Sequence, residues 1–421
     1  MKTTKKKQKK QQTTQKTQKT QKTQKTQKIQ KTTQKTKKQQ TKTYIIKSAY
    51  LKPTKVKGIL SNKTSKNIIW EEYNKDKHGN NPDWIHTDEK FTYDKSLWKY
   101  KSTLKSTIDL EDKVVTNKYN LVASLKHLGN KNLDKMLMEQ YKINLYDLYK
   151  TSKNKKSKYK KSKYKKSSST SPNTNLSKYK HLFDNNRVWI FKPIYGHEGK
   201  DILIFKSFED FYRTVTNKIN NSSNRQRWKH LNYKKYKKMR NLAKFALNIE
   251  WVLQEYITNP LLYKNKKFHL RGYYLFHRES HKKKTGYLFD NHRIFTASEP
   301  YINGDYLNKK IHDTHIGSTP SEINYNPDIK HTLTKQQRDS IDKQLDILFK
   351  NILKVINSKC YPENKYCYHT FASDIMITDT YHIKLIELNT RPGMGEYFKQ
   401  KVDYPHLVFE TVVDKVVNHH F

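Results

Sequence analysis

The sequence predicts an α+β protein in which a basic arm without regular structure precedes a folded body. Residues 1–43 are almost only Lys, Thr and Gln, with a repeating "QKT" triplet, so they have little apolar surface to offset the entropy of ordering. From residue 114 onward, segments with helical spacing of apolar residues alternate with short apolar strands. The hydrophobic content of 34% is low for a fully folded chain of 421 residues, which agrees with this division.

Changes in composition divide the chain into four parts. A disordered arm at 1–43 precedes a small N-terminal subdomain at 44–111, a central subdomain at 112–253 and a C-terminal subdomain at 254–421. A run rich in Lys and Ser at 151–178 interrupts the central subdomain. Its position between two better patterned regions predicts a long inserted surface loop.

The protein carries a formal net charge of +48, of which 26 charges come from lysines in residues 1–43 and 150–166. The rest belongs to the folded body, which is therefore basic too. A basic surface favours polyanions such as nucleic acid, an anionic membrane surface or an acidic polypeptide. Charge does not choose among these partners, and a solvated basic surface without a partner is the alternative interpretation.

Two cysteines occur, Cys360 and Cys367, and neither a disulfide framework nor a zinc-ligand spacing follows from them. Reduced thiols of an intracellular protein are therefore predicted. No apolar run approaches the length of a membrane span, and no hydrophobic stretch follows the charged N-terminus. We expect a cytoplasmic protein that is not secreted.

A strand, a glycine loop and a second strand are predicted over residues 187–205. Lys192 closes the first strand, and Gly196 and Gly199 follow it. Glycines let a backbone approach a phosphate, and a lysine beside them supplies positive charge. The spacing is not that of a P-loop, and an ordinary hairpin would show the same pattern.

One later strand has a cationic face. The sequence "KFHLR" sets Lys267, His269 and Arg271 at alternate positions, and side chains at alternate positions share one face of a strand. Arg293 lies in the next strand-like stretch. A helix is predicted over residues 333–358, where apolar residues at three- and four-residue steps mark core positions.

Two apolar runs joined by "DTYH" predict an antiparallel hairpin. Asp374 then lies opposite Glu387, and Asn389 follows two residues later on the same face. Two opposed carboxylates repel in a bare sheet, and a Mg²⁺ ion, which takes oxygen ligands together with nucleotide phosphates, would remove that conflict. The alternative is the solvent-facing polar side of an amphipathic hairpin.

Five segments in this order resemble the tubulin–tyrosine ligase family, whose fold is an ATP-grasp. They extend from about Val114 to Gly393 and read "VVTNKYNLVASL", "WIFKPIYGHEGKDI", "WVLQEYITNPLLYKNKKFHLRGYYLF", "RIFTASEPY" and "SDIMITDTYHIKLIELNTRPG". The resemblance implies an ATP-grasp fold for the central and C-terminal subdomains. It also implies ATP-dependent joining of a carboxylate to an amine through an acyl-phosphate.

The resemblance further implies roles for individual residues. The residues that it places at the nucleotide are Lys118, Lys192, Gly196, Gly199, Gln254, Glu255, Tyr256, Ile257, Lys267 and His269. Arg271 and Arg293 match the positions that hold the acyl-phosphate or the carboxylate of the amino acid. Asp374, Glu387 and Asn389 match the ligands of Mg²⁺.

Four positions depart from the usual pattern of the family. His269 stands where an aspartate is common, and His315 stands where an asparagine is expected. Asp201 replaces a usual glycine, and Glu255 replaces a frequent Lys or Arg. Such changes could alter substrate choice or produce an inactive pseudo-enzyme, whereas the retained cations and carboxylates favour activity.

The leading interpretation is an ATP- and Mg²⁺-dependent ligase that adds a free amino acid (Tyr, Glu or Gly) to a protein acceptor such as the acidic tail of tubulin. The basic body would attract such a tail. The competing interpretation is a degenerate ATP-grasp scaffold that binds nucleic acid or the cytoskeleton through its lysine tracts. A third is an ATP-grasp ligase acting on a small molecule or on a protein unrelated to tubulin.

Overall fold

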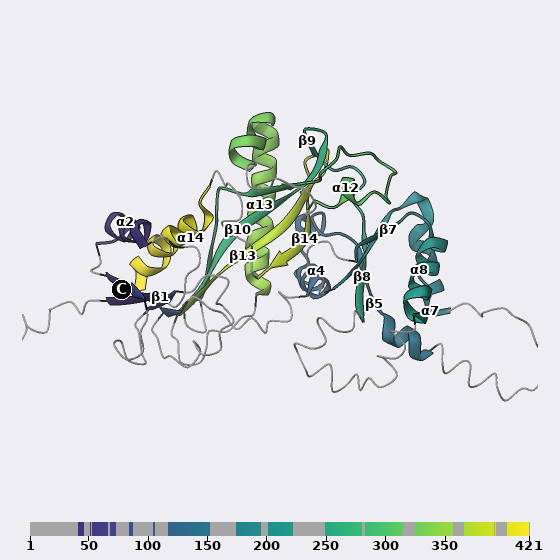
Figure 1. The fold of residues 1–421 in the computed structure, drawn as a ribbon, viewed down its shortest axis with the longest axis horizontal. Coiled ribbons are helices and arrows are strands. Elements are labelled where there is room, and N and C mark those ends of the chain that lie inside the picture. The colour runs from purple at the N-terminus through teal and green to yellow at the C-terminus, as the bar shows by residue number, and fades with distance from the viewer. Residues whose placement is uncertain are drawn as a thin grey trace, which may run out of the picture.

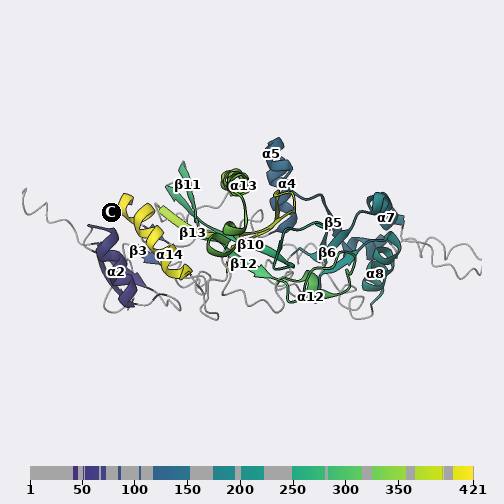
Figure 2. The same cartoon turned by 90° about the horizontal axis from the view of Figure 1, so that it is seen from above.

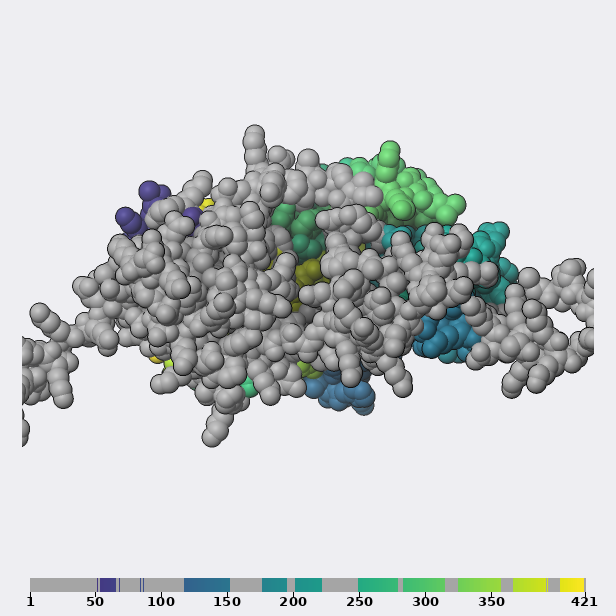
Figure 3. All heavy atoms as spheres, turned by 60° about the horizontal axis from the view of Figure 1, so that its bottom comes forward, coloured from purple at the N-terminus to yellow at the C-terminus, as the bar shows by residue number. Residues whose placement is uncertain are grey.

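The computed structural model describes residues 41–45, 51, 53–65, 68–72, 84–86, 104–105, 117–151, 174–194, 201–221, 249–279, 283–314, 325–356, 366–390, 392 and 402–420. These residues form a large and a small β-sheet with helices packed against them, arranged along an elongated body (Figure 1). In the space-filling view of Figure 3, purple N-terminal atoms lie toward the opposite end from the blue and teal atoms of the small sheet and its helices.

The large sheet has ten strands among the described residues, with the main order β11-β10-β13-β4-β3-β1-β2. Strands β12 and β9 pair with β10, and β14 pairs with β13. Its strands are β1 (Thr41–Ile45), β2 (Ile68–Glu72), β3 (Trp84–His86), β4 (Leu104–Lys105), β9 (Leu262–Tyr263), β10 (Lys266–Glu279), β11 (Lys283–Leu288), β12 (Arg293–Thr296), β13 (Tyr366–Ile377) and β14 (Ile383–Asn389). The long strands β10 and β13 are antiparallel neighbours and form its centre.

The predicted small N-terminal subdomain does not build a sheet of its own in the part of it that is described. Strands β1 to β4 continue the large sheet, because β4 pairs in parallel with β13 and β3 pairs with both β4 and β1. Strand β1 also shows that residues 41–43, predicted as part of the disordered arm, are extended and paired with β2 and β3. Residues 1–40 of the arm lie outside the described residues.

The small sheet has the order β5-β8-β6-β7 and all its neighbours are antiparallel. Its strands are β5 (Gln140–Asn144), β6 (Trp189–Pro193), β7 (Leu203–Phe205) and β8 (Glu250–Glu255). The predicted strand–loop–strand unit over 187–205 is therefore confirmed as the antiparallel pair β6–β7. Helices α7 (Thr174–Ser177) and α8 (Phe208–Asn220) accompany this sheet, and Phe211, Val215 and Ile219 of α8 are buried against it.

Alternate residues of β10 face two different cores. Phe268, Leu270 and Phe276 pack against α13 (Lys335–Val355) and α4 (Lys118–Lys126). Tyr273 and Leu275 point to the opposite face, where the C-terminal helix α14 (Tyr404–Val412) and the N-terminal helix α2 (Pro53–Lys63) pack. Figure 2 shows α13, α4 and the short α5 (Lys131–Asp134) together on one side of β10 and β13.

Helix α13 confirms the helix predicted over 333–358. A capping box formed by Thr334 and Gln337 fixes its start, since each side chain bonds the backbone N–H of the other residue. All four predicted apolar positions are buried: Ile341, Leu345, Leu348 and Ile352. No helix of the described residues is long and apolar enough to cross a membrane.

Three further expectations differ from the structure. The predicted insertion 151–178 ends earlier, because 174–177 form α7 and Leu176 is fully buried. The predicted central subdomain begins at residue 112, yet α4 packs with the core of the large sheet. Cys367 is buried in β13 and is disulfide-bonded, so the prediction of reduced thiols is wrong for this residue.

Candidate active site

A pocket of about 680 Å³ is lined by residues of both sheets and of the loop before and after the short helix α12 (Lys309–His312). This volume is typical of sites for small organic ligands. Seven of the predicted site residues line the pocket: Lys118, Lys192, Tyr256, Lys267, His269, Asp374 and Glu387. The structure therefore brings together side chains that are widely separated in the sequence.

The carboxylates of β13 and β14 lie opposite one another, as the hairpin predicted, because Asp374 pairs with Glu387 in register. The register shifts directly after Asp374, so that one extra residue of β14 is accommodated there. Such a bulge re-aims neighbouring side chains, and both Ile386 and Glu387 contribute to the pocket lining.

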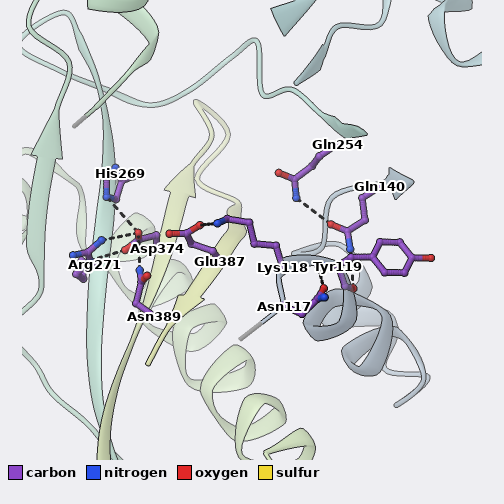
Figure 4. A network of polar contacts seen from close by, with 10 residues as sticks. All are labelled: Asn117, Lys118, Tyr119, Gln140, Gln254, His269, Arg271, Asp374, Glu387 and Asn389. Carbon is purple, nitrogen blue, oxygen red and sulfur yellow. Dashed lines mark hydrogen bonds and ion pairs between the residues drawn. The ribbon is translucent and has the colours of Figure 1, made fainter. Parts of the chain in front are cut away.

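Asp374 is held by side chains from both neighbouring strands (Figure 4). Arg271 of β10 donates two hydrogen bonds, from Nε to Oδ1 at 2.7 Å and from Nη2 to Oδ2 at 2.8 Å. Asn389 of β14 donates a third, from Nδ2 to Oδ2 at 2.9 Å. Burial works to lower the pKa of Arg271, but the charge of Asp374 outweighs it and raises that pKa. The Arg271 guanidinium therefore stays charged beside Asp374.

Glu387 is paired with Lys118, the first residue of α4, at 2.9 Å between Nζ and Oε2. Asn117 caps this helix by accepting the backbone N–H groups of Tyr119 and Asn120, which places Lys118 at the helix start facing β14 (Figure 4). Burial favours the neutral carboxyl, but Lys118 and Lys192 outweigh burial and keep the pKa of Glu387 below its usual value.

Two buried lysines approach the pocket from different sheets. Lys192 of β6 is 5% exposed and Lys267 of β10 is 3% exposed. Burial lowers the pKa of Lys192 to about 8, although Glu387 opposes the shift. Burial, with the charge of Lys192, lowers the pKa of Lys267 to about 7. Buried ammonium groups of this kind are ready partners for an anion, whose charge would replace their lost hydration.

Phe295 organises the cationic face of β10. It lies opposite His269 across β10 and β12, and the two rings stack with centroids 4.8 Å apart. The guanidinium carbons of Arg271 and Arg293 each lie 4.7 Å from the Phe295 ring centroid. His269 Nδ1 also contacts the Thr314 hydroxyl at 2.6 Å. Phe295 thus contacts the side chains of His269, Arg271 and Arg293. The face of an aromatic ring attracts cations, so these contacts stabilise the two guanidinium groups.

Other predicted residues do not line the pocket. Arg271, Arg293 and Asn389 are absent from its lining. Arg271 and Asn389 are nevertheless connected to the pocket, because both donate hydrogen bonds to Asp374. Gln254 bonds Gln140 on the neighbouring strand.

Glu255, the last residue of β8, and Ile257, two residues beyond it, have partners outside the pocket. Glu255 lies 3.2 Å from Arg187, which also binds Glu139 at 2.6 Å. Ile257 packs with Met138 and Met376. Their predicted contacts with a nucleotide, which depend on backbone groups, stay predictions.

The remaining predicted positions lie in the glycine loop or differ from the usual pattern of the family. Gly196, Gly199 and His315 lie outside the described residues. Asp201, which stands where the family usually has glycine, has a φ of 62°, a left-handed conformation that glycine adopts most easily.

Sequence reasoning missed Phe295, Thr314 and His312. The first of these is the residue two positions after Arg293, and the period of two would have placed it on the same face.

The donor set fits a Mg²⁺ ion by chemical type. Two opposed carboxylates and an amide oxygen are the hard oxygen ligands that this ion prefers, and it commonly completes its shell with phosphates. Among the described residues, no group of three or more His, Cys, Asp and Glu side chains converges as a metal site. An ion at Asp374 and Glu387 would therefore depend on Asn389 and on ligands from a nucleotide.

Curated relatives match a little over half of the chain. A Caenorhabditis elegans protein named probable tubulin polyglutamylase ttll-9 is 22% identical over 254 residues, which make up 55% of this chain and 52% of the relative. The Rattus norvegicus protein polyglycylase TTLL10 is 24% identical over 255 residues, or 55% of this chain and 35% of the relative. The chain thus spans about half or less of the length of these relatives.

A solved structure is similar to the fold. The crystal structure of the C-terminal domain of K. lactis Pby1, described as an ATP-grasp enzyme interacting with the mRNA decapping enzyme Dcp2, aligns with a TM-score of 0.55 and 16% identity. The alignment covers 90% of this chain and 94% of that domain. The mixed α+β fold is therefore of the ATP-grasp type. The model of the tubulin–tyrosine ligase family matches residues 123–421, and the chain belongs to that family.

Proposed function

We propose that the protein is an ATP- and Mg²⁺-dependent ligase that joins Tyr, Glu or Gly to a carboxylate of a protein acceptor, such as an acidic tubulin tail. Membership of an ATP-grasp family implies ATP binding. Two relatives are named for polyglutamylation of tubulin and for polyglycylation, which supports an amino acid as the second substrate and a protein as the acceptor.

One observation carries the proposal. The opposed carboxylates Asp374 and Glu387 share a pocket with the ammonium groups of Lys118, Lys192 and Lys267. The carboxylates on the polar side of a solvent-facing hairpin would be exposed, whereas Asp374 is only 2% exposed. Buried cations and carboxylates in one pocket of nucleotide size are what phosphoryl transfer requires, since its transition state is stabilised by positioned charge.

The proposed reaction has two steps. A carboxylate oxygen of the acceptor forms a bond to the terminal phosphorus of ATP, and ADP leaves. The amine of the amino acid then attacks the acyl carbon, phosphate leaves, and the amine loses a proton to give the amide. Mg²⁺, when bound, supplies positive charge to the phosphates.

The residues of the pocket have separate parts in this proposal. Lys192 and Lys267 would hold phosphate oxygens, and Glu387 and Asp374 would hold the ion. Arg271 fixes Asp374 through its two hydrogen bonds. Arg293, whose guanidinium carbon lies 4.7 Å from the centre of the same Phe295 ring, would hold the acyl-phosphate or the carboxylate of the amino acid.

The test is ADP release by the full chain, measured with each amino acid and each candidate acceptor, with product identified by mass spectrometry. We expect release to require Mg²⁺, amino acid and acceptor together. The Glu387→Gln and Lys192→Ala variants should lose about 100-fold or more in rate. Glu250→Gln and Lys142→Ala are matched controls, because this ion pair (2.7 Å) lies on the small sheet outside the pocket lining.

Full activity in Glu387→Gln and Lys192→Ala would refute the assignment of the site. Absence of ADP release in the wild-type protein, combined with polyanion binding that falls steeply with salt, would favour the degenerate scaffold instead.

A further inference from the structure

His312 belongs to a chain of hydrogen bonds that begins at a pocket lysine. Lys267 Nζ lies 2.6 Å from the Tyr256 hydroxyl, which lies 2.6 Å from His312 Nδ1. On its other side, His312 Nε2 lies 2.6 Å from the backbone carbonyl of Asp305. These hydrogen bonds therefore connect β10 of the large sheet to the loop that forms one wall of the pocket.

The chemistry of the two ends fixes the direction of every bond in this chain. The Asp305 carbonyl can only accept, so the proton of the neutral imidazole lies on Nε2. Nδ1 is then an acceptor, and the Tyr256 hydroxyl must donate to it. The Tyr256 oxygen can therefore accept a hydrogen bond from the Lys267 ammonium. A hydroxyl that donates its own proton becomes a better acceptor, since consecutive hydrogen bonds polarise one another.

Aromatic packing holds the imidazole in this orientation. The His312 ring stacks on Tyr306 with centroids 5.7 Å apart and meets Tyr301 edge-on at 5.8 Å. Tyr256 also meets His312 nearly at right angles, at 5.7 Å. His312 thus has little freedom to turn, and the Tyr256 hydroxyl is presented to Lys267 from one direction.

Lys267 depends on this acceptor because it is buried. The charged groups that act on it are Lys192, which disfavours its protonation, and Asp313, which favours it. The hydroxyl of Tyr256 is the acceptor that faces it directly, and Lys267 Nζ also lies 4.1 Å from the centre of that ring. Burial lowers the pKa of His312 as well, so the ring is neutral near pH 7 and stays an acceptor.

We propose that His312 is a positioning residue which, through Tyr256, orients the Lys267 ammonium into the pocket and favours its protonated form, to which an anionic ligand would bind. This inference rests on the proposed function in one respect, since the anion is taken to be the phosphate chain of ATP. The hydrogen-bond chain itself is independent of that identification.

The first arm of the test needs no nucleotide. The full chain is acylated with acetic anhydride across pH 6 to 10, and labelling of Lys267 is followed by peptide-resolved mass spectrometry, because only the neutral amine reacts. We expect the midpoint of Lys267 labelling to move to lower pH by about 0.5 to 1 unit in His312→Ala and further in Tyr256→Phe. His312→Asn, whose carboxamide oxygen can replace Nδ1 as acceptor, should recover part of the shift.

The matched control is Tyr301→Phe. It removes a hydroxyl from the same aromatic cluster, where Tyr301 donates to the Thr258 carbonyl at 2.7 Å, but it leaves the chain from Lys267 to Asp305 intact. We expect a lower melting temperature and an unchanged Lys267 midpoint. An equal shift in Tyr301→Phe and His312→Ala would overturn the proposal, because the effect would then be general loosening of the cluster. An unmoved midpoint in His312→Ala, with a shift in Tyr256→Phe, would overturn it too.

The second arm measures ATP affinity by calorimetry at pH 6.5, 7.5 and 8.5. A charge-assisted hydrogen bond is worth about 10- to 100-fold, so Tyr256→Phe should weaken ATP binding by about 10-fold and His312→Ala by about 3-fold, most strongly at pH 8.5. If the wild-type protein does not bind ATP while the labelling midpoints shift as expected, the proposed function fails and the role of His312 stands. Should Tyr256→Phe or His312→Ala fail to fold, the Lys267 labelling midpoints of His312→Asn and Tyr301→Phe are compared. A shift in His312→Asn alone supports the proposal, and equal midpoints in the two variants overturn it.

Discussion

The two halves of β10 show how one face of one strand can serve two purposes. In the first half, Lys267, His269 and Arg271 point toward the pocket or toward Asp374. In the second half, Tyr273 and Leu275 occupy the same alternation but pack under α14, with the rings of Tyr273 and Tyr404 4.6 Å apart. The period of the strand decides which residues share a face, whereas the element that covers the face decides whether it becomes a core or a site.

The largest effect should come from breaking the ion pair in the first half. Arg271→Leu removes the bidentate partner of the buried Asp374, which should lower the free energy of unfolding by about 3–5 kcal/mol and abolish ligation. In the Arg271→Leu/Asp374→Leu double variant, most of the stability should return and the activity should not. Denaturant unfolding measures the stability, and ADP release measures the activity. A double variant as unstable as the single one would contradict this account.

A substitution in the second half should separate stability from binding. Leu275→Ala creates a cavity beneath α14, and we expect a loss of about 2–5 kcal/mol in the free energy of unfolding. The ATP affinity of the folded protein should change by less than about 2-fold, since additivity holds for sites without shared partners. Calorimetry below the unfolding transition tests it, and a 10-fold loss of affinity would show that the two halves are coupled.

The depressed pKa values of the first half predict how ATP binding depends on pH. Lys267 and Lys192 lose their protons near pH 7 and pH 8, so ATP affinity should fall as the pH rises through this range. Stability should change in the opposite sense. Because the unfolded chain binds these protons up to about pH 10.4, stability should rise from pH 7 toward pH 10. In Lys267→Met, both dependences should become shallower; an identical pH profile would exclude Lys267 as their source.

The smallest effect is expected where β8 ends, beyond the cationic face. Glu255→Gln weakens a half-exposed pair with Arg187, which keeps Glu139 as a partner, so we expect less than about 1 kcal/mol in stability. ATP affinity should change by less than about 3-fold if only backbone groups of this stretch contact the nucleotide. A larger loss of affinity would extend the site to the Glu255 side chain.

Local periodicity predicted much of this arrangement. The short link "DTYH" fixed the register that sets Asp374 opposite Glu387, and alternation alone placed Lys267, His269 and Arg271 together. The capping residues and apolar steps of α13 are equally local signals. Features of this kind follow from the sequence because the residues involved are near one another in the chain.

Long-range packing was not predictable in the same way. Lys118 reaches Glu387 because α4 packs on the large sheet, and no sequence period indicates that contact. Likewise, the side chains that fix Lys267 depend on the loop around α12 folding back over the pocket. The roles given to individual residues by family resemblance stay predictions until the variants above are measured.

The order of strands in the large sheet has a consequence for how the molecule assembles. Strands β1 to β3 are joined to the sheet centre through β4, and β4 pairs with β13, which is made far later during synthesis. The pairs Lys55–Asp403 and Lys63–Glu410 likewise join early segments to late ones. Contacts of such high sequence separation form slowly. Strands β1 to β4 pair with one another early, whereas β4 has to wait for β13. We therefore expect this early group of strands to leave the ribosome with the β13-facing edge of β4 unpaired and to rely on chaperones until β13 has been synthesised.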